Sequence, residues 1–88
     1  MTMLTDKVIV VTGGSTGIGR ATAKILGAEG ATVAILDVQD DEGENTVEMI
    51  ANAGGAAEYH HVDVGDYSSV QSTIATIVKA HGKLDGAF

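Results

Sequence analysis

A glycine-rich turn directly after an apolar run constrains the fold of this chain more than any other feature. The run VIVV at 8–11 is typical of a strand buried on both faces, and TGGSTGIG follows it at 12–19. A helical pattern begins at Ile18. Glycines between a buried parallel strand and a helix leave backbone amides accessible, and these amides can bind a phosphate. The segment therefore predicts a phosphate-binding turn.

The remaining sequence alternates apolar segments with amphipathic ones. Strands are expected at 7–12, 32–36, 57–62 and 84–88, and helices are expected to begin near Ile18, Asp40 and Asp66 and to end at Gly30, Gly54 and Gly82. Right-handed crossovers then give the strand order 3-2-1-4. We predict an α/β fold, a partial Rossmann doubly wound parallel sheet in three layers. Residues 1–88 are interpreted as the N-terminal dinucleotide-binding portion of one domain, with no second domain.

Apolar spacing predicts which side of the first helix faces the core. Ile18, Ala21, Ile25 and Leu26 recur at helical spacing, so we expect them to form the buried face. Gly27 is interpreted as a packing glycine against the sheet. The third expected strand is the most polar of the four, which places it at a sheet edge.

Composition excludes several classes of function. The chain has five basic and twelve acidic residues, a net charge of −7, so neither nucleic acid nor an anionic membrane surface is an expected partner. It has no cysteine and no apolar stretch long enough to span a membrane, and a cytoplasmic location is expected. No metal site is expected, because the neighbours His60 and His61 point to opposite faces of a strand.

Two common glycine motifs do not match the turn. The dinucleotide fingerprint G-x-G-x-x-G fails because Gly17-Ile18-Gly19 is followed by Thr22 at the last position. The P-loop fails because Arg20 and Ala21 replace its lysine and its hydroxyl residue. A nucleotide hydrolase would lack both essential side chains.

A third pattern, T-G-x-x-x-G-x-G, matches Thr12, Gly13, Gly17 and Gly19. Together with Asp37, Asp63-Val64 and Lys83-Leu84-Asp85, it resembles the short-chain dehydrogenase/reductase family over the whole chain. The resemblance implies that the three glycines admit a cofactor pyrophosphate, that the Ile18 amide bonds it, and that Ser15 and Thr16 lie over the adenosine ribose and phosphate. It also implies that Asp63 and the Val64 backbone contact adenine, and that Thr12 ties the turn to the strand after the third helix. The predicted cofactor-binding residues are Gly13, Ser15, Thr16, Gly17, Ile18, Gly19, Asp37, Val38, Asp63 and Val64.

Asp37 predicts NAD rather than NADP as the cofactor. It ends the second expected strand, where a carboxylate can accept hydrogen bonds from ribose hydroxyls and would repel a 2′-phosphate. Members of the family that prefer NADP usually carry a basic residue where this chain has Thr16 or Val38. Two plainer interpretations stay open: Asp37 as a solvated turn residue, and Asp63 as the cap of the turn before the third helix.

The family's catalytic Tyr-x-x-x-Lys pair does not occur in these residues. Tyr59 is followed four positions later by Asp63, and Tyr67 by Gln71, so no catalytic residue is assigned. We expect the NAD-binding portion of an oxidoreductase that acts on CH-OH groups, inactive alone, whose full-length form takes a small-molecule substrate and is a homo-oligomer. The alternative is a complete, non-catalytic nucleotide-binding or interaction module that dimerises through its open fourth strand. The substrate is not indicated.

Overall fold

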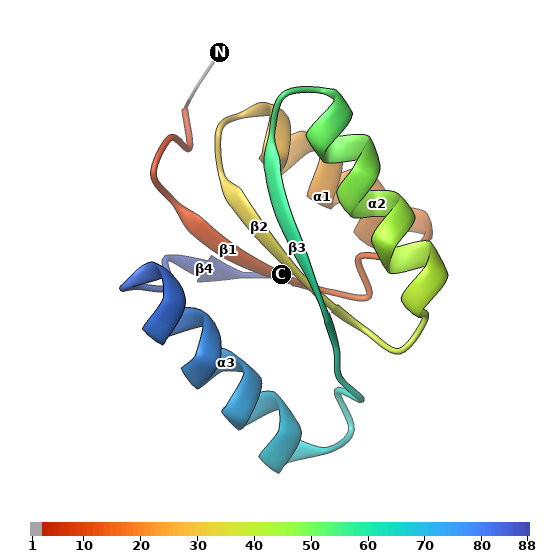
Figure 1. Cartoon of the computed structure of the whole chain (residues 1–88), viewed down its shortest axis with the longest axis vertical. Helices are drawn as coiled ribbons and strands as arrows, with labels where there is room; N and C mark the ends of the chain where they lie inside the picture. Colours follow the sequence, from red (N-terminus) through yellow and green to blue (C-terminus); the bar gives the residue numbers. More distant parts are fainter. Residues whose placement is uncertain (1–2) are drawn as a thin grey trace.

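A computed structural model of the chain describes residues 3–88 and places four parallel strands between three helices (Figure 1). The elements are β1 (Val8–Thr12), α1 (Gly17–Ala28), β2 (Thr32–Asp37), α2 (Asp40–Asn52), β3 (Ala56–His61), α3 (Tyr67–His81) and β4 (Gly86–Ala87). The strand order is β3-β2-β1-β4, as predicted, and β3 lies at an edge. The polar sequence of β3 therefore fits its position.

The helices divide between the two faces of the sheet. α1 and α2 cover one face and α3 covers the other, which confirms the three layers (Figure 1). Alternate residues of the central strands supply both cores. The core under α1 and α2 includes Val11, Ala23, Val33, Ile35 and Ile50, and the core under α3 includes Val8, Val10, Ala34, Leu36, Val62 and Ile77.

Of the four residues expected on the buried face of α1, Leu26 packs against the core, while Ile18, Ala21 and Ile25 are exposed. Ile18 is 78% exposed and Ile25 is 64% exposed, while Ala23 and Gly27 are buried. Small residues allow the helix to lie close to its neighbours: a Cβ on Gly27 would come within 2.8 Å of Ile50 Cγ2. Gly27 is therefore a packing glycine, but it packs against α2. Close packing of small side chains has outweighed the burial of two isoleucines.

The ends of the elements follow the predicted capping residues. Asp66 Oδ1 accepts a hydrogen bond from the Ser69 amide at 3.2 Å, and Gly82 ends α3 in the left-handed conformation. β3 begins and ends one residue earlier than expected. β4 is shorter than the predicted 84–88, and just before it the Val8 amide donates to the Asp85 carboxylate, at 2.8 Å, rather than to a backbone carbonyl.

Thr12 links β1 to the end of the chain, as predicted. Its amide and its hydroxyl both donate to the Phe88 carbonyl, at 3.0 and 3.2 Å. The carboxyl end of β1, from which the glycine turn starts, is therefore held on the β4 side as well as on the β2 side.

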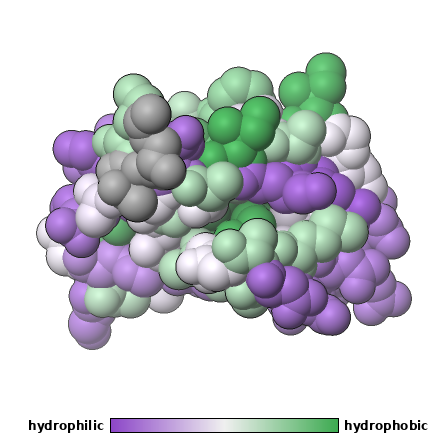
Figure 2. Space-filling model, turned by 90° about the horizontal axis from the view of Figure 1, so that it is seen from above, coloured by the Kyte–Doolittle hydropathy of each residue, from purple (hydrophilic) through white to green (hydrophobic). Residues whose placement is uncertain are grey.

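Hydrophobic residues also reach the surface, in separate groups between hydrophilic ones (Figure 2). Among residues 3–88, no helix has the length and apolar character needed to cross a bilayer.

Candidate functional site

The turn between β1 and α1 presents open backbone at the carboxyl edge of the sheet. Gly13 and Gly17 have φ angles of 69° and 57°, a region that side chains disfavour. A Cβ on either residue would meet nothing within 4 Å. The space above both glycines is thus free for a ligand to approach the backbone.

Gly19 serves a different purpose from these two glycines. A Cβ at this position would lie 1.9 Å from the Gly13 carbonyl oxygen and 3.1 Å from the Gly14 amide nitrogen. The first turn of α1 therefore lies directly on the start of the glycine turn, and only glycine fits this contact.

The amino end of α1 carries backbone amides without helical acceptors. The first hydrogen bond of the helix runs from the Arg20 amide to the Thr16 carbonyl at 3.2 Å, so the amides of Gly17, Ile18 and Gly19 precede it. The N-cap residue Thr16 makes no side-chain cap, and the first turn has no acidic residue. This arrangement, at the positive end of the helix dipole, suits an anion such as a pyrophosphate.

Asp37 joins the end of β2 to the glycine turn. Its Oδ1 accepts a hydrogen bond from the Val38 amide at 2.7 Å, and its Oδ2 accepts one from the Ser15 amide at 3.2 Å. Burial raises the pKa of this carboxyl, but the hydrogen bonds outweigh burial, so the pKa lies below its usual value. Asp37 is thus a carboxylate at neutral pH, beside the turn.

Ser15 lies beneath the turn rather than over it. Its side chain is fully buried, and its Oγ forms no hydrogen bond within normal geometric limits in residues 3–88. The hydroxyl is still near enough to the Asp37 carboxyl to favour its charged form. Contact between Ser15 and a cofactor stays a prediction, and the structure assigns the residue a supporting position under the backbone.

Arg20 is directed to α2 and away from the turn. Its Nη2 donates to the Glu42 carbonyl and to Glu42 Oε2, both at 3.0 Å, and its Nε donates to Thr46 Oγ1 at 2.9 Å. The positive charge of Arg20, at the start of α1, is therefore paired with α2. An anion in the turn would be bound by amides and the helix dipole.

The other predicted site residues lie at the same edge of the sheet, after β2 and β3. The Val62 amide donates to the Asp37 carbonyl at 2.9 Å, which brings Asp63 next to the end of β2. Val38 and Val64 are 50% and 57% exposed, and Asp63 Oδ1 accepts a hydrogen bond from the Gly65 amide at 2.8 Å. Asp63 therefore caps the turn before α3, which was the plainer interpretation, and adenine contact stays a prediction.

Sequence reasoning missed a polar network behind the site. The Tyr59 hydroxyl lies 2.6 Å from Asp40 Oδ1 and 2.9 Å from the Asp37 carbonyl, and His61 Nδ1 lies 2.6 Å from the same Asp40 oxygen. Burial, followed by the hydrogen bond to Asp40, raises the pKa of Tyr59. A periodicity search cannot find such contacts, because they depend on how α2 crosses the end of β3.

A second missed cluster lies on the α3 face. His60 Nε2 and His81 Nε2 are each 2.5 Å from an oxygen of Glu58, so both histidines share one carboxylate. Within the described part of the chain, no set of three or more His, Cys, Asp or Glu side chains is arranged to hold a metal ion.

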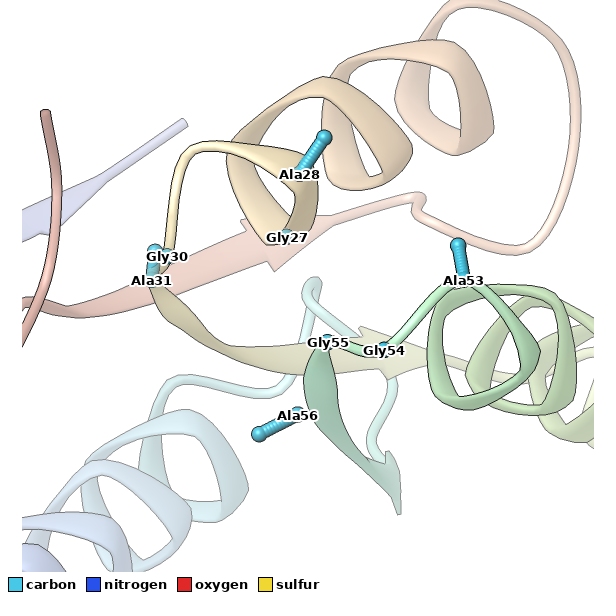
Figure 3. Close-up of a pocket in the computed structure, with 8 residues that line it drawn as sticks. All are labelled: Gly27, Ala28, Gly30, Ala31, Ala53, Gly54, Gly55 and Ala56. Carbon is cyan, nitrogen blue, oxygen red and sulfur yellow. The ribbon is translucent and has the colours of Figure 1, made fainter. Parts of the chain in front are cut away.

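The opposite edge of the sheet holds a cavity of about 280 Å³ lined by glycines and alanines from 27–31 and 53–56 (Figure 3). It lies before β2 and β3, far from the turn along both strands, and none of the predicted cofactor residues lines it. Its lining contributes no charged or hydroxyl side chain, so it lacks the groups that would orient a nucleotide.

Comparison with known proteins identifies the family. The profile described as short chain dehydrogenase matches residues 7–87. The chain is 44% identical, over all 88 residues, to 2,5-dichloro-2,5-cyclohexadiene-1,4-diol dehydrogenase of Sphingobium indicum. The chain therefore belongs to the short-chain dehydrogenase/reductase family, and it corresponds to the N-terminal NAD(P)-binding region of such enzymes.

Solved structures agree with this placement. A metagenomic short-chain oxidoreductase in complex with NADP superposes with a TM-score of 0.93 at 34% identity, over 97% of this chain and 38% of that one. An NAD⁺-bound xylitol dehydrogenase superposes with a TM-score of 0.91 at 33% identity, over 97% of this chain and 33% of that one. The chain spans about a third of the Sphingobium enzyme (34%), and its structural relatives include one with each cofactor.

Proposed function

We propose that this chain is the NAD-binding portion of an oxidoreductase that moves hydride between the nicotinamide and an alcohol or carbonyl substrate. The observation that carries this proposal is the Asp37 carboxylate, bonded to the Ser15 amide at the end of β2 and held in its charged form. It supplies a hydrogen-bond acceptor for ribose hydroxyls and a negative charge against a 2′-phosphate.

The proposed cofactor uses the amides at the start of α1 for its pyrophosphate. Gly13, Gly17 and Gly19 admit the diphosphate, and the Ile18 amide donates to it. Thr16, exposed at the N-cap, lies on the ribose side. Val38, Val64 and Asp63 border the adenine. Since Arg20 is occupied by Glu42 and Thr46, binding depends little on side-chain cations.

The hydride-transfer chemistry is proposed to come from residues outside this sequence. Neither tyrosine has a lysine four positions later, and the Tyr59 hydroxyl is already hydrogen-bonded within the α2–β3 network. Its raised pKa also makes it a poor proton donor near neutral pH. Small-molecule substrate binding and homo-oligomer formation belong to the same proposed full-length enzyme.

Calorimetric titration of the 88-residue chain with NAD⁺ and NADP⁺ tests the cofactor assignment. NAD⁺ is expected to bind more tightly, and Asp37→Ala is expected to weaken NAD⁺ binding and to narrow the preference. An unchanged affinity ratio in the variant would remove Asp37 from the site.

The non-catalytic alternative is tested by the intact mass of the product that its own gene yields. A mass near 8.9 kDa would favour a binding module, and a much larger mass would favour the oxidoreductase. A module that completes its sheet by pairing is also expected to be a dimer at micromolar concentration, which ultracentrifugation would detect.

A further inference from the structure

A polar cluster of Arg20, Glu42 and Thr46 connects α1 to α2 next to the glycine turn. Thr46 of α2 is fully buried, and its Oγ1 accepts a hydrogen bond from Arg20 Nε at 2.9 Å. Arg20 is held in turn by the carbonyl and carboxylate of Glu42, and its side chain is 23% exposed.

The Thr46 hydroxyl connects this polar cluster to the turn itself. Oγ1 lies 3.4 Å from the Ser15 carbonyl and 3.2 Å from the Glu42 carbonyl. A guanidinium can only donate, so Arg20 occupies an acceptor position on Oγ1 and leaves the single hydroxyl proton to the two carbonyls. The Ser15 carbonyl is therefore directed toward α2.

The direction of this carbonyl determines the direction of the next amide. In a trans peptide the carbonyl of one residue and the N–H of the next point to opposite sides. With the Ser15 carbonyl directed at α2, the Thr16 N–H points away from α2. Since Asp37 already holds the Ser15 amide, both peptide groups around Ser15 are fixed.

We propose that Thr46 is a positioning residue for the turn and that Arg20 acts through it by orienting its hydroxyl. The proposal rests on the proposed dinucleotide binding, because the Ser15–Thr16 peptide that it orients directly precedes the amides of Gly17, Ile18 and Gly19, which are proposed to bind the pyrophosphate. Thr46 touches no cofactor atom. It acts by keeping the turn in its binding conformation before the ligand arrives, which lowers the entropic cost of binding.

The test compares Thr46→Val and Thr46→Ser with Thr76→Val in the 88-residue chain. Thr76 controls for loss of a threonine hydroxyl on an exposed helix face, since its hydroxyl donates to the Ser72 carbonyl of its own helix at 3.0 Å. Thr46→Val is expected to raise the Kd for NAD⁺ about fivefold to tenfold, the effect of one hydrogen bond. Thr46→Ser is expected to stay within about twofold of the parent.

Hydrogen exchange of the Ser15 amide gives a second readout that needs no ligand. Thr46→Val should speed this exchange by about fivefold or more relative to Thr76→Val. Equal exchange in the two variants would overturn the positioning role. If the parent chain binds no NAD⁺, the proposed function fails, while the exchange comparison still decides the role of Thr46.

Arg20→Met separates the role of Arg20 from a packing defect at Thr46. It removes the donors, keeps an apolar stem and leaves the buried Thr46 in place, so it also serves if Thr46→Val does not fold. Its effects on Kd and exchange should have the same direction as those of Thr46→Val. The double variant of Arg20→Met and Thr46→Val should have the same Kd for NAD⁺ as Thr46→Val alone. Fully additive increases in Kd would refute the inference that Arg20 acts through Thr46.

Discussion

The Ser15 amide donates a hydrogen bond to Asp37 Oδ2 at 3.2 Å, across 22 positions of the sequence. This contact gives Asp37 a structural role in addition to its proposed ligand role, because the carboxylate that would meet the ribose also supports the turn that would meet the pyrophosphate. Replacing Asp37 therefore changes both halves of the candidate site. Asp37→Asn, which removes the charge and keeps the size of the side chain and one of its two acceptors, is therefore more informative than Asp37→Ala.

Asp37→Asn is expected to narrow the preference for NAD⁺ over NADP⁺ by about tenfold, equivalent to about 1.4 kcal/mol. The amide oxygen of asparagine can still accept one backbone hydrogen bond, while the negative charge that opposes a 2′-phosphate is lost. The Kd values for both cofactors, measured by calorimetry, give the ratio. A larger ratio in the variant would contradict the electrostatic explanation.

Gly19→Ala is expected to destabilise the fold by more than about 2 kcal/mol, because its Cβ would meet the Gly13 carbonyl oxygen at 1.9 Å. Gly86→Ala is the matched control, since a Cβ there meets nothing within 4 Å. Urea denaturation measures both variants. Equal midpoints would show that the start of α1 can move away from the turn without cost.

Ser15→Ala is expected to leave stability within about 1 kcal/mol of the parent, because the buried hydroxyl makes no regular hydrogen bond whose loss would leave a partner unpaired. NAD⁺ affinity then decides the role of the side chain: an unchanged Kd would fit a hydroxyl that lies under the turn and makes no cofactor contact. A clear loss of NAD⁺ affinity without loss of stability would restore the direct contact that the family resemblance implies.

Glu58→Gln is expected to reduce the acid sensitivity of the fold. Burial raises the pKa of Glu58. The hydrogen bonds and charges of His60 and His81 lower it by more than burial raises it, so the pKa lies below its ordinary value of 4.5. The stability that this lowered pKa contributes is fully present above pH 4.5, and it is lost as the pH falls through the pKa of Glu58 in the folded state.

Thermal unfolding of the parent and Glu58→Gln at pH 7 and pH 3 tests this assignment. The difference in Tm between the two proteins should be largest at pH 7 and should shrink at pH 3. His81→Gln serves as a control: it keeps the Glu58 carboxylate and a hydrogen-bond donor at the end of α3, and it removes the imidazole. A Tm difference that does not vary with pH would contradict the role of the carboxylate.

Strand order and layer arrangement could be predicted because they follow from the βα alternation and the handedness of crossovers. The glycine turn and Asp37 were found because their spacing along the chain is local. The predicted buried face of α1 was right for Leu26 and wrong for Ile18 and Ile25, since hydropathy favoured the isoleucines while packing favoured Ala23 and Gly27. Arg20 with Thr46, and Glu58 with His81, meet only after the helices dock, 26 and 23 positions apart, and no local pattern marks such pairs.

The pairing of β1 with the last residues has a consequence for how the protein emerges from the ribosome. β1 is made first and lies in the middle of the sheet, yet the Val8 amide finds its acceptor on Asp85, 77 positions later. During synthesis, the β4 side of β1 therefore stays uncovered until residues 85–88 have left the exit tunnel. Until then, residues 8–12 pair only with β2 and leave their other side open to a nascent-chain chaperone.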